Sequence, residues 1–251
     1  NETGNYGLSL QRLNNPGMGT TLSFGQSVAG AISQLAELDT YTFTGMAGDV
    51  VLVRMGVSSY QLDPQIRLYR PDGTLLCSVA GDFSNGGGVV ELNESNCVIL
   101  PEDGQYKLVA GDGYDSANDG TGNYGLSLQR LNNPGMGTVL SFGDSVTGKI
   151  DLLGEVDTYT FTATSGDRVL FRMGASSFQL DPQIRLYGPD GALLCSKAID
   201  SPFEGGVAEL NDSNCAALLS DGQYTLLAGD NGGNETGNYG LSLQRLNNPG
   251  M

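Results

Sequence analysis

Histidine and tryptophan are absent from this 251-residue chain, and basic residues are few. Without histidine, the chain can form neither a Ser-His-Asp nor a Cys-His catalytic group, and the usual histidine-bearing zinc sites are excluded. Its 12 Lys and Arg residues face 28 Asp and Glu residues, which gives a formal net charge of −16. Phosphate binding depends on Lys and Arg, so neither nucleic acid nor an anionic lipid surface is an expected partner. No apolar run reaches the 18 residues of a transmembrane helix, so membrane insertion is not expected.

Hydrolysis by a pair of carboxylates is a chemistry that these residue types leave open. Nothing in the order of the acidic residues pairs two carboxylates in a recognisable glycosidase arrangement. We therefore expect a protein that is not an enzyme.

An internal repeat dominates the sequence. The string GNYGLSLQRLNNPGM starts at Gly4, Gly122 and Gly237, at intervals of 118 and then 115 residues. Residues 4–112 align with 122–230 without a gap, and 78 of the 109 aligned positions are identical. The difference of three residues falls in one loop, 113–121 in the first copy and 231–236 in the second.

The ends of the chain extend this repeat, because residues 1–18 are identical to residues 234–251. The simplest interpretation is an alternating array with a period of 233 residues; an accidental choice of boundaries is the alternative. The expected organisation is a final strand and linker of a preceding repeat (1–18), a first β-sandwich repeat (19–133), and a second repeat with the following linker (134–251). The link 131–137 is short and contains one proline, so it predicts closely spaced domains.

Apolar and polar residues alternate with a period of two through most of each copy, which is typical of β-strands. Tyr41 and Phe43 share one face of the run 39–44. In the next run, Val50 is replaced by Arg168 in the second copy. This replacement indicates that Val50 and every second residue after it face solvent, and that the residues between them face the core. Eight or nine such strands per copy, each with one apolar face, predict an all-β chain of tandem antiparallel β-sandwich domains.

Each copy carries two cysteines, 20 residues apart in both cases: Cys77 and Cys97, then Cys195 and Cys215. The spacing predicts one disulfide within each domain and an oxidising, extracellular or cell-surface location. A disulfide that closes a loop of this length stabilises a fold by about 3 kcal/mol. Buried free thiols are the alternative, and alkylation without a reductant distinguishes the two.

Several motifs occur in one order in both copies: LDTYTFT (38–44), AGD (47–49), LDPQIRLY (62–69), PDGTLL (71–76), DGQY (103–106) and GNYGLSL (122–128). This series resembles the bacterial pre-peptidase C-terminal domain over nearly all of each copy. The resemblance implies a jelly-roll-like, non-catalytic sandwich of secreted bacterial and archaeal proteins. Such domains usually follow a peptidase, and relatives in clostridial collagenases bind collagen and calcium. This chain contains no peptidase, and its cysteines are not a feature of that family.

The acidic loop that ends each copy is the candidate metal site. Calcium needs six to eight oxygen ligands, and the first loop offers several carboxylate and amide oxygens. The candidates are Asp112, Asp115, Asn118 and Asp119, with Asp230 in the second copy. The alternative, which we favour, is a turn held by hydrogen bonds from side chains to the backbone. Asp39, Asp63, Asp157 and Asp181 raise the same two alternatives, and turn capping is again favoured.

The N-terminal run with Tyr6, Leu8 and Leu10 is predicted to be the last strand of a neighbouring unit, since it has no domain of its own in this chain. The strand is either shared along one continuous polypeptide, which we favour, or donated between subunits. The expected function is therefore a structural repeat of an extracellular fibre or stalk, with further copies of itself as partners. The alternative is an adhesin or substrate-targeting module for a matrix protein or polysaccharide.

Overall fold

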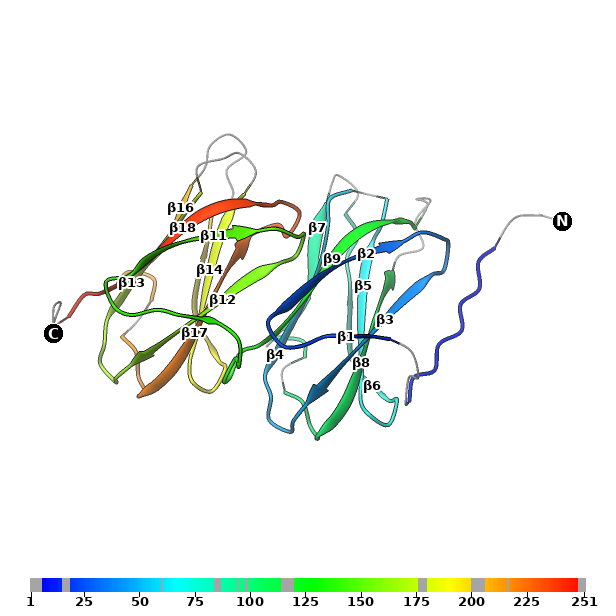
Figure 1. Cartoon of the computed structure of the whole chain (residues 1–251), viewed down its shortest axis with the longest axis horizontal. Coiled ribbons are helices and arrows are strands. Elements are labelled where there is room, and N and C mark those ends of the chain that lie inside the picture. The colour runs from blue at the N-terminus through cyan, green and yellow to red at the C-terminus, as the bar shows by residue number, and fades with distance from the viewer. Residues whose placement is uncertain are drawn as a thin grey trace.

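The chain folds into two β-sandwiches that stand side by side along the long axis of the molecule (Figure 1). The computed structural model describes residues 6–14, 19–59, 61–83, 87–93, 95–97, 99–113, 120–175, 180–199, 206–215 and 217–247. This part of the chain contains no long apolar helix of the kind that crosses a membrane. The prediction of tandem β-sandwiches is confirmed.

The first sandwich has a five-stranded and a four-stranded sheet. The five-stranded sheet has the order β1-β3-β8-β5-β6, and the four-stranded sheet has the order β2-β9-β4-β7. Their bounds are β1 Thr20–Thr21, β2 Gln26–Ile32, β3 Leu38–Gly45, β4 Val51–Val57, β5 Pro64–Tyr69, β6 Leu75–Ala80, β7 Gly88–Leu92, β8 Gly104–Asp112 and β9 Gly122–Arg130. All pairings are antiparallel except that of β1 with β3, which is parallel.

The second sandwich repeats this topology. Its five-stranded sheet has the order β10-β12-β17-β14-β15, and its four-stranded sheet has the order β11-β18-β13-β16. Their bounds are β10 Thr138–Val139, β11 Ser145–Ile150, β12 Val156–Ala163, β13 Val169–Ala175, β14 Pro182–Tyr187, β15 Leu193–Ala198, β16 Val207–Leu210, β17 Gly222–Asp230 and β18 Gly237–Arg245. The second sandwich thus has the same strand order as the first.

Each sandwich has its own core between its two sheets. In β4 the residues of the predicted inward parity, Val51, Val53 and Met55, are completely buried. Their counterparts in β13 are also in the core: Val169, Phe171 and Met173. Burial of such side chains removes apolar surface from water, which is the main favourable contribution to folding.

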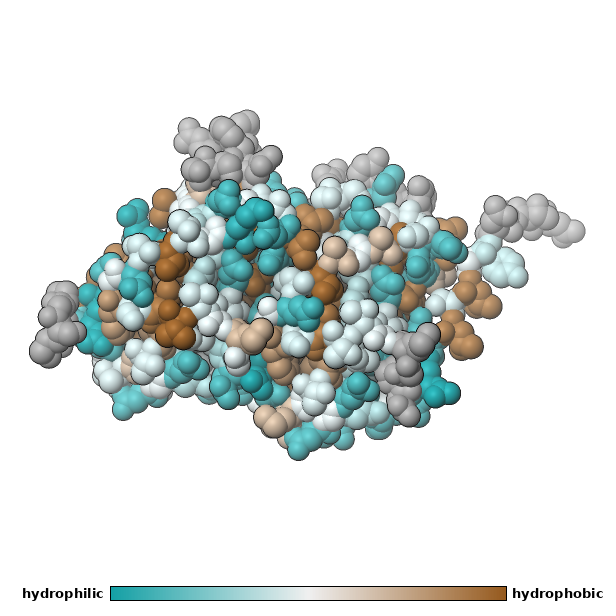
Figure 2. Space-filling model, in the orientation of Figure 1, coloured by the Kyte–Doolittle hydropathy of each residue, from teal (hydrophilic) through white to brown (hydrophobic). Residues whose placement is uncertain are grey.

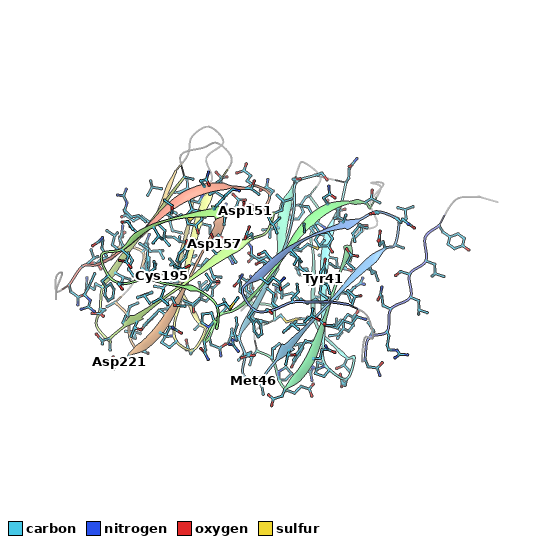
Figure 3. The ribbon with its side chains drawn as sticks, in the orientation of Figure 1. Tyr41, Met46, Asp151, Asp157, Cys195 and Asp221 are labelled. Carbon is cyan, nitrogen blue, oxygen red and sulfur yellow. A yellow bond between two sulfur atoms is a disulfide. The ribbon has the colours of Figure 1, made fainter. Side chains whose placement is uncertain are left out.

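A chain of hydroxyl groups links the two sheets of the first sandwich. The hydroxyls of Tyr41 in β3 and Tyr124 in β9 lie 2.7 Å apart, and Tyr124 donates to Asp39 at 2.6 Å. The aromatic ring of Tyr124 passes over Gly30, where a Cβ would lie 2.3 Å from a ring atom. The structure therefore corrects the expectation that Asp39 caps a turn: this carboxylate accepts a hydrogen bond from a buried phenol. Figure 3 shows Tyr41 within the first sandwich.

The second sandwich contains the same group. Tyr159 and Tyr239 have hydroxyls 2.8 Å apart, and Tyr239 donates to Asp157 at 2.5 Å. Burial raises the pKa of the Asp157 carboxyl above its usual value, even though the hydrogen bond from Tyr239 opposes this shift. The repeated geometry assigns Asp157, like Asp39, to the link between sheets.

Both cysteine pairs are disulfides in the structure. Cys77 lies on β6 at the edge of the five-stranded sheet, and Cys97 follows β7 at the edge of the four-stranded sheet. Their Cα atoms lie 5.7 Å apart, within the normal range for a disulfide. Each bond therefore joins the two sheets along one open edge of its sandwich, and the two bonds point to an extracellular location.

Replacing Cys77 and Cys97 together by serine should destabilise the first sandwich by about 3 kcal/mol, because the unfolded chain is no longer cross-linked. Calorimetric unfolding of this variant should show one component moved to a lower temperature. The matched control replaces Cys195 and Cys215, which should move the component of the second sandwich. Two variants with the melting profile of the parent chain would contradict this assignment.

Candidate functional site: the interface between the sandwiches

The outer face of the first four-stranded sheet packs directly on the outer face of the second five-stranded sheet. The burial of β4 shows this contact, since all seven residues of β4 are buried, whereas burial alternates along the equivalent β13. The structure thus corrects the expectation that the parity of Val50 faces solvent. In the first copy this parity faces the neighbouring sandwich, and only in the second copy does it face water.

An apolar cluster forms the centre of the interface. The first sandwich supplies side chains from the start of β4 and the end of β9, and the second supplies them from β12, β14 and β17. The members, all at most 6% exposed, are Val50, Leu52, Leu131, Val156, Tyr187 and Leu227. Each large apolar side chain removed from water contributes about 2 kcal/mol, so this cluster opposes separation of the sandwiches.

Two glycines let the backbones approach closely. A Cβ at Gly125 in β9 would lie 1.9 Å from the carbonyl oxygen of Leu153, and one at Gly56 in β4 would lie 2.1 Å from that of Gly233. Both contacts come from turns of the second sandwich, and the turn 151–155 lies between the two sandwiches (Figure 3). Gly154 of this turn has a φ of 67°, while the equivalent residue of the first sandwich is Ala36, with a φ of 59°.

A buried group of three charges crosses the interface beside the apolar cluster. Glu91 in β7 lies 2.6 Å from Nε of Arg54 in β4, and it accepts two hydrogen bonds from Arg185 in β14, at 2.7 and 2.9 Å. Arg54 also donates to the carbonyl oxygen of Asp230 at 3.0 Å. The side chain of Arg54 is completely buried, and those of Glu91 and Arg185 are 13% exposed.

The two guanidinium groups control the ionisation of Glu91. Burial raises the pKa of this carboxyl, but the charges of Arg54 and Arg185 outweigh burial and lower the pKa to about 2. Burial alone would lower the pKa of Arg185, yet the charge of Glu91 and its hydrogen bonds raise it above the usual value. Glu91 and Arg185 are therefore charged at neutral pH, and the hydrogen bonds between them fix the position of one sandwich on the other.

Polar side chains complete the interface. Gln129 in β9 is 1% exposed; it donates to the carbonyl oxygen of Val156 at 3.3 Å and accepts from the hydroxyl of Thr158 at 2.7 Å. Thr225 donates to the carbonyl oxygen of Leu131 at 2.9 Å. These bonds align the end of β9 along β12 and β17.

The N-terminal segment (residues 6–14) makes the same contacts on the opposite end of the molecule (Figure 1). Gln11, which is equivalent to Gln129, donates to the carbonyl oxygen of Leu38 at 3.2 Å and accepts from Thr40 at 2.9 Å. A Cβ at Gly7, equivalent to Gly125, would lie 2.0 Å from the carbonyl oxygen of Leu35. The segment therefore lies on the first five-stranded sheet in the register that β9 takes on the second.

The opposite side of the N-terminal segment is exposed. Tyr6, Leu8 and Leu10 are 88, 88 and 95% exposed, and Figure 2 shows apolar atoms on this segment, beyond the first sandwich. Their equivalents in β9 are the core residues Tyr124, Leu126 and Leu128. No strand assignment covers residues 6–12 within the described chain, so the proposed sharing of this strand with a neighbouring unit stays a prediction.

Of the candidate calcium residues, Asp230 borders this interface through its carbonyl oxygen, and Asp112 holds the equivalent position in the first sandwich. Asp115, Asn118 and Asp119 fall outside the described residues. Asp112 accepts a hydrogen bond from the backbone N–H of Asp63 at 3.0 Å, and Asp230 accepts from those of Asp181 and Asn234 at 2.9 and 3.1 Å. These hydrogen bonds agree with the alternative of a turn held by bonds between side chains and the backbone. Across the described residues, no group of three or more Asp, Glu, Cys or His side chains is placed to hold a metal ion.

Sequence reasoning missed the interface residues, although a signal was available. Along β4 and β13 the outward residues are the same in both copies: Leu52 and Leu170, Arg54 and Arg172, Gly56 and Gly174. Outward positions that only meet water have no reason to retain a glycine and an arginine within a strand. The repetition of these residues could have indicated that this face binds another protein surface.

No protein-family model matches the chain, and no curated protein matches it. Among solved structures, it is similar to the pre-peptidase C-terminal domain of a collagenase from Bacillus anthracis, with 15% identity over 45% of this chain and 99% of that one, at a TM-score of 0.32. It is also similar to a protein from Eubacterium rectale described as secreted, with 13% identity over 92% and 80% of the two chains, at a TM-score of 0.34. A third is the CUB1-EGF-CUB2 region of human MASP-1/3, with 12% identity over 86% and 99%, at a TM-score of 0.24. At these levels the comparisons assign neither a family nor a function.

Replacing Gly56 by valine should separate the sandwiches, because the new side chain would overlap the backbone of the turns at Gly154 and Gly233. The matched control is Gly174→Val, since the nearest atom to a Cβ there lies 3.6 Å away. Small-angle X-ray scattering of the monomeric chain, in dilute solution, should show a larger radius of gyration for Gly56→Val and no change for the control. Equal radii for the two variants would contradict this role of Gly56.

The interface should weaken at low pH. The pKa of Glu91 is about 2 in the folded chain and about 4.3 when the glutamate is exposed, so its contribution is fully present above pH ~4.3 and is lost as the pH falls towards 2. The difference in stability between the parent chain and Glu91→Gln should be about 3 kcal/mol at pH 7 and should vanish near pH 2. Denaturant unfolding at both pH values measures it. A difference that does not depend on pH would rule out this ionisation.

Proposed function

We propose that the chain is a non-catalytic structural repeat of an extracellular fibre or stalk, in which β-sandwiches stack with the four-stranded face of one on the five-stranded face of the next. The observation that carries the proposal is the interface between the two sandwiches. It combines an apolar cluster, close backbone contact at Gly56 and Gly125, and a buried charged group in one fixed arrangement. Domains on a free tether need none of these features.

The composition of the units supports the same role. Both sandwiches have one topology and one disulfide each, so stability is distributed over similar units, as in other repeat proteins. Through the hydrogen bonds of Gln11, the N-terminal segment lies on the first five-stranded face in the register that β9 takes on the second, which supports one common type of contact. A stack of such units would therefore use one type of contact repeatedly.

Antibodies against this chain should label extended fibres on or near the cells that produce it, with a regular axial repeat of one sandwich. Electron microscopy of native material provides the test, and the same cells without the encoding sequence provide the control. Labelling of dispersed particles alone, or of a secreted enzyme that carries these domains as targeting modules, would contradict the structural role.

A further inference from the structure

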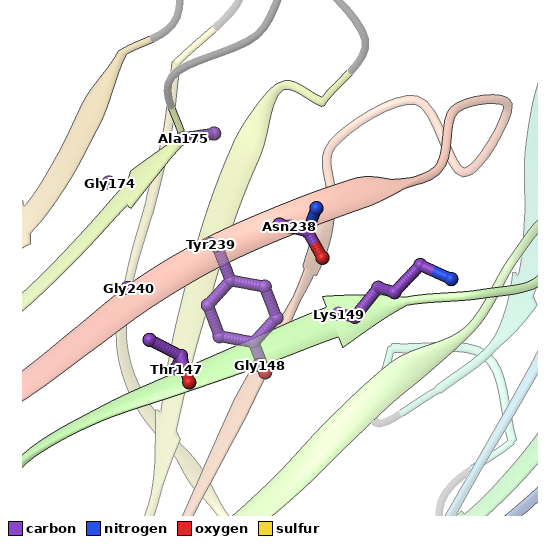
Figure 4. A pocket seen from close by; sticks show the side chains of 8 residues that line it. All are labelled: Thr147, Gly148, Lys149, Gly174, Ala175, Asn238, Tyr239 and Gly240. Carbon is purple, nitrogen blue, oxygen red and sulfur yellow. The ribbon is translucent and has the colours of Figure 1, made fainter.

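The four-stranded sheet of the second sandwich presents an open outer face. A shallow hollow runs over β11, β13 and β18, and Figure 4 shows its lining around Gly174 and Gly240. A Cβ at Gly240 would meet no atom within 4 Å, whereas the equivalent Gly125 is covered by the turn 151–155. The hollow is thus the place that a turn of a further sandwich would fill.

The charged residues of the interface are also present on this open face. Arg172 and Glu209, equivalent to Arg54 and Glu91, form an ion pair at 3.0 Å and are 54 and 35% exposed. The missing member is an equivalent of Arg185, and Arg67 in β5 of the first sandwich has that position in the repeat. One end of the chain therefore carries two members of the charged group, and the other end carries the third.

The apolar residues are divided between the two ends in the same way. The open face retains Leu170 and Leu246 in place of Leu52 and Leu131. The first five-stranded sheet retains Leu38, Tyr69 and Val109 in place of Val156, Tyr187 and Leu227. Arg168 replaces Val50, and the turn that it would approach contains both Arg70 and Asp72.

The N-terminal segment lies on the outer face of the first five-stranded sheet. Its hydrogen bonds through Gln11 and its contact at Gly7 reproduce those of β9. Since residues 234–251 repeat residues 1–18, β18 of another copy carries the same residues for this place: Gly240, Ser242 and Gln244 correspond to Gly7, Ser9 and Gln11.

We propose that the open four-stranded face of the second sandwich binds the five-stranded face of the first sandwich in a second copy of this chain, with β18 of that neighbour in the place of the N-terminal segment. This inference rests on the proposed function and names its repeating contact. Glu209 then pairs with Arg67 of the other copy, and the turn 33–37 of that copy fills the hollow at Gly174 and Gly240. The contact is head-to-tail, so it repeats from copy to copy and forms an open filament where the rotation between copies does not close a ring.

Sedimentation velocity of the full chain over a range of concentrations measures this association. Glu209→Arg and Arg67→Glu should each weaken it at least about tenfold, by leaving like charges opposed in the contact. An equimolar mixture of the two variants should associate, because the unaltered Glu209 of one variant then meets the unaltered Arg67 of the other, and the two altered residues also carry opposite charges. Glu102→Arg, with the same change in charge at a position that is serine in the second copy, should leave association unchanged. A mixture as weak as its components would overturn the assigned pairing.

The glycines provide a test that does not depend on charge. Gly240→Val should abolish association and leave the melting temperature of the chain unchanged, since the new side chain meets only open space. Ala36→Gly should strengthen association, because a Cβ at the equivalent Gly154 would lie 2.7 Å from the backbone nitrogen of Gly56. Unaltered association in Gly240→Val would overturn the proposal.

Deleting residues 1–14 distinguishes stacking from exchange of a strand. In our proposal the N-terminal segment competes with β18 of the neighbour, so the deletion should strengthen association. Weaker association would overturn the proposal and indicate that the segment inserts into the neighbour. Dissociation constants above about 1 mM for both the full chain and the deletion variant would also overturn it.

The outcomes separate this contact from the proposed function. Fibres in native material together with unaffected association of the Gly240→Val and Glu209→Arg variants would leave the structural role standing and remove the contact. Specific association of the chain in solution without fibres in native material would remove the structural role and retain the contact.

Discussion

Close backbone contact at Gly56 and Gly125 is the constraint on which the rest of the interface depends. With no Cβ on these strands, the turns at Leu153 and Gly233 lie directly on the sheet surface. At this separation the side chain of Arg185 lies 2.7 Å from Glu91. These backbone contacts set the distance between the two sheets, and the apolar cluster packs at that distance. A single methyl group on either strand would hold the two surfaces apart.

The apolar and charged parts of the interface contribute in different ways. Taking Arg54 and Glu91 out of water costs free energy that offsets much of their attraction, so such groups are weak sources of stability. The apolar cluster around Leu52 and Leu227 supplies the favourable burial instead. The charged group penalises any other alignment, because a shifted partner would leave a buried charge without its hydrogen bonds. Affinity and register therefore come from neighbouring but separate residues.

The sequence predicted the interior of each sandwich better than its exterior. Alternation along 51–55 identified the core residues because inward positions of a strand must be apolar whatever lies outside the domain. The replacement of Val50 by Arg168 predicts an exposed position, which is correct for the second copy and wrong for the first. Two copies of one sequence can have different neighbours, and a pattern within a strand contains no information on what covers its outer face. Asp39 and Asp157 were misassigned for a related reason, since the tyrosines that bind them lie more than 80 residues away in the sequence.

One difference between the two copies has a mechanical consequence. Gly154 adopts a left-handed conformation at no steric cost, but Ala36 adopts it in the equivalent turn with a methyl group that costs about 1 kcal/mol or more. At the equivalent Gly154, a Cβ would point towards the backbone of Gly56 in the neighbouring sandwich. In a fibre of alternating units, joints made by the turn with Ala36 would be wider than joints made by the turn with Gly154. Under tension or bending, such a fibre would yield at every second joint, and its smallest unbroken fragment would be a pair of sandwiches.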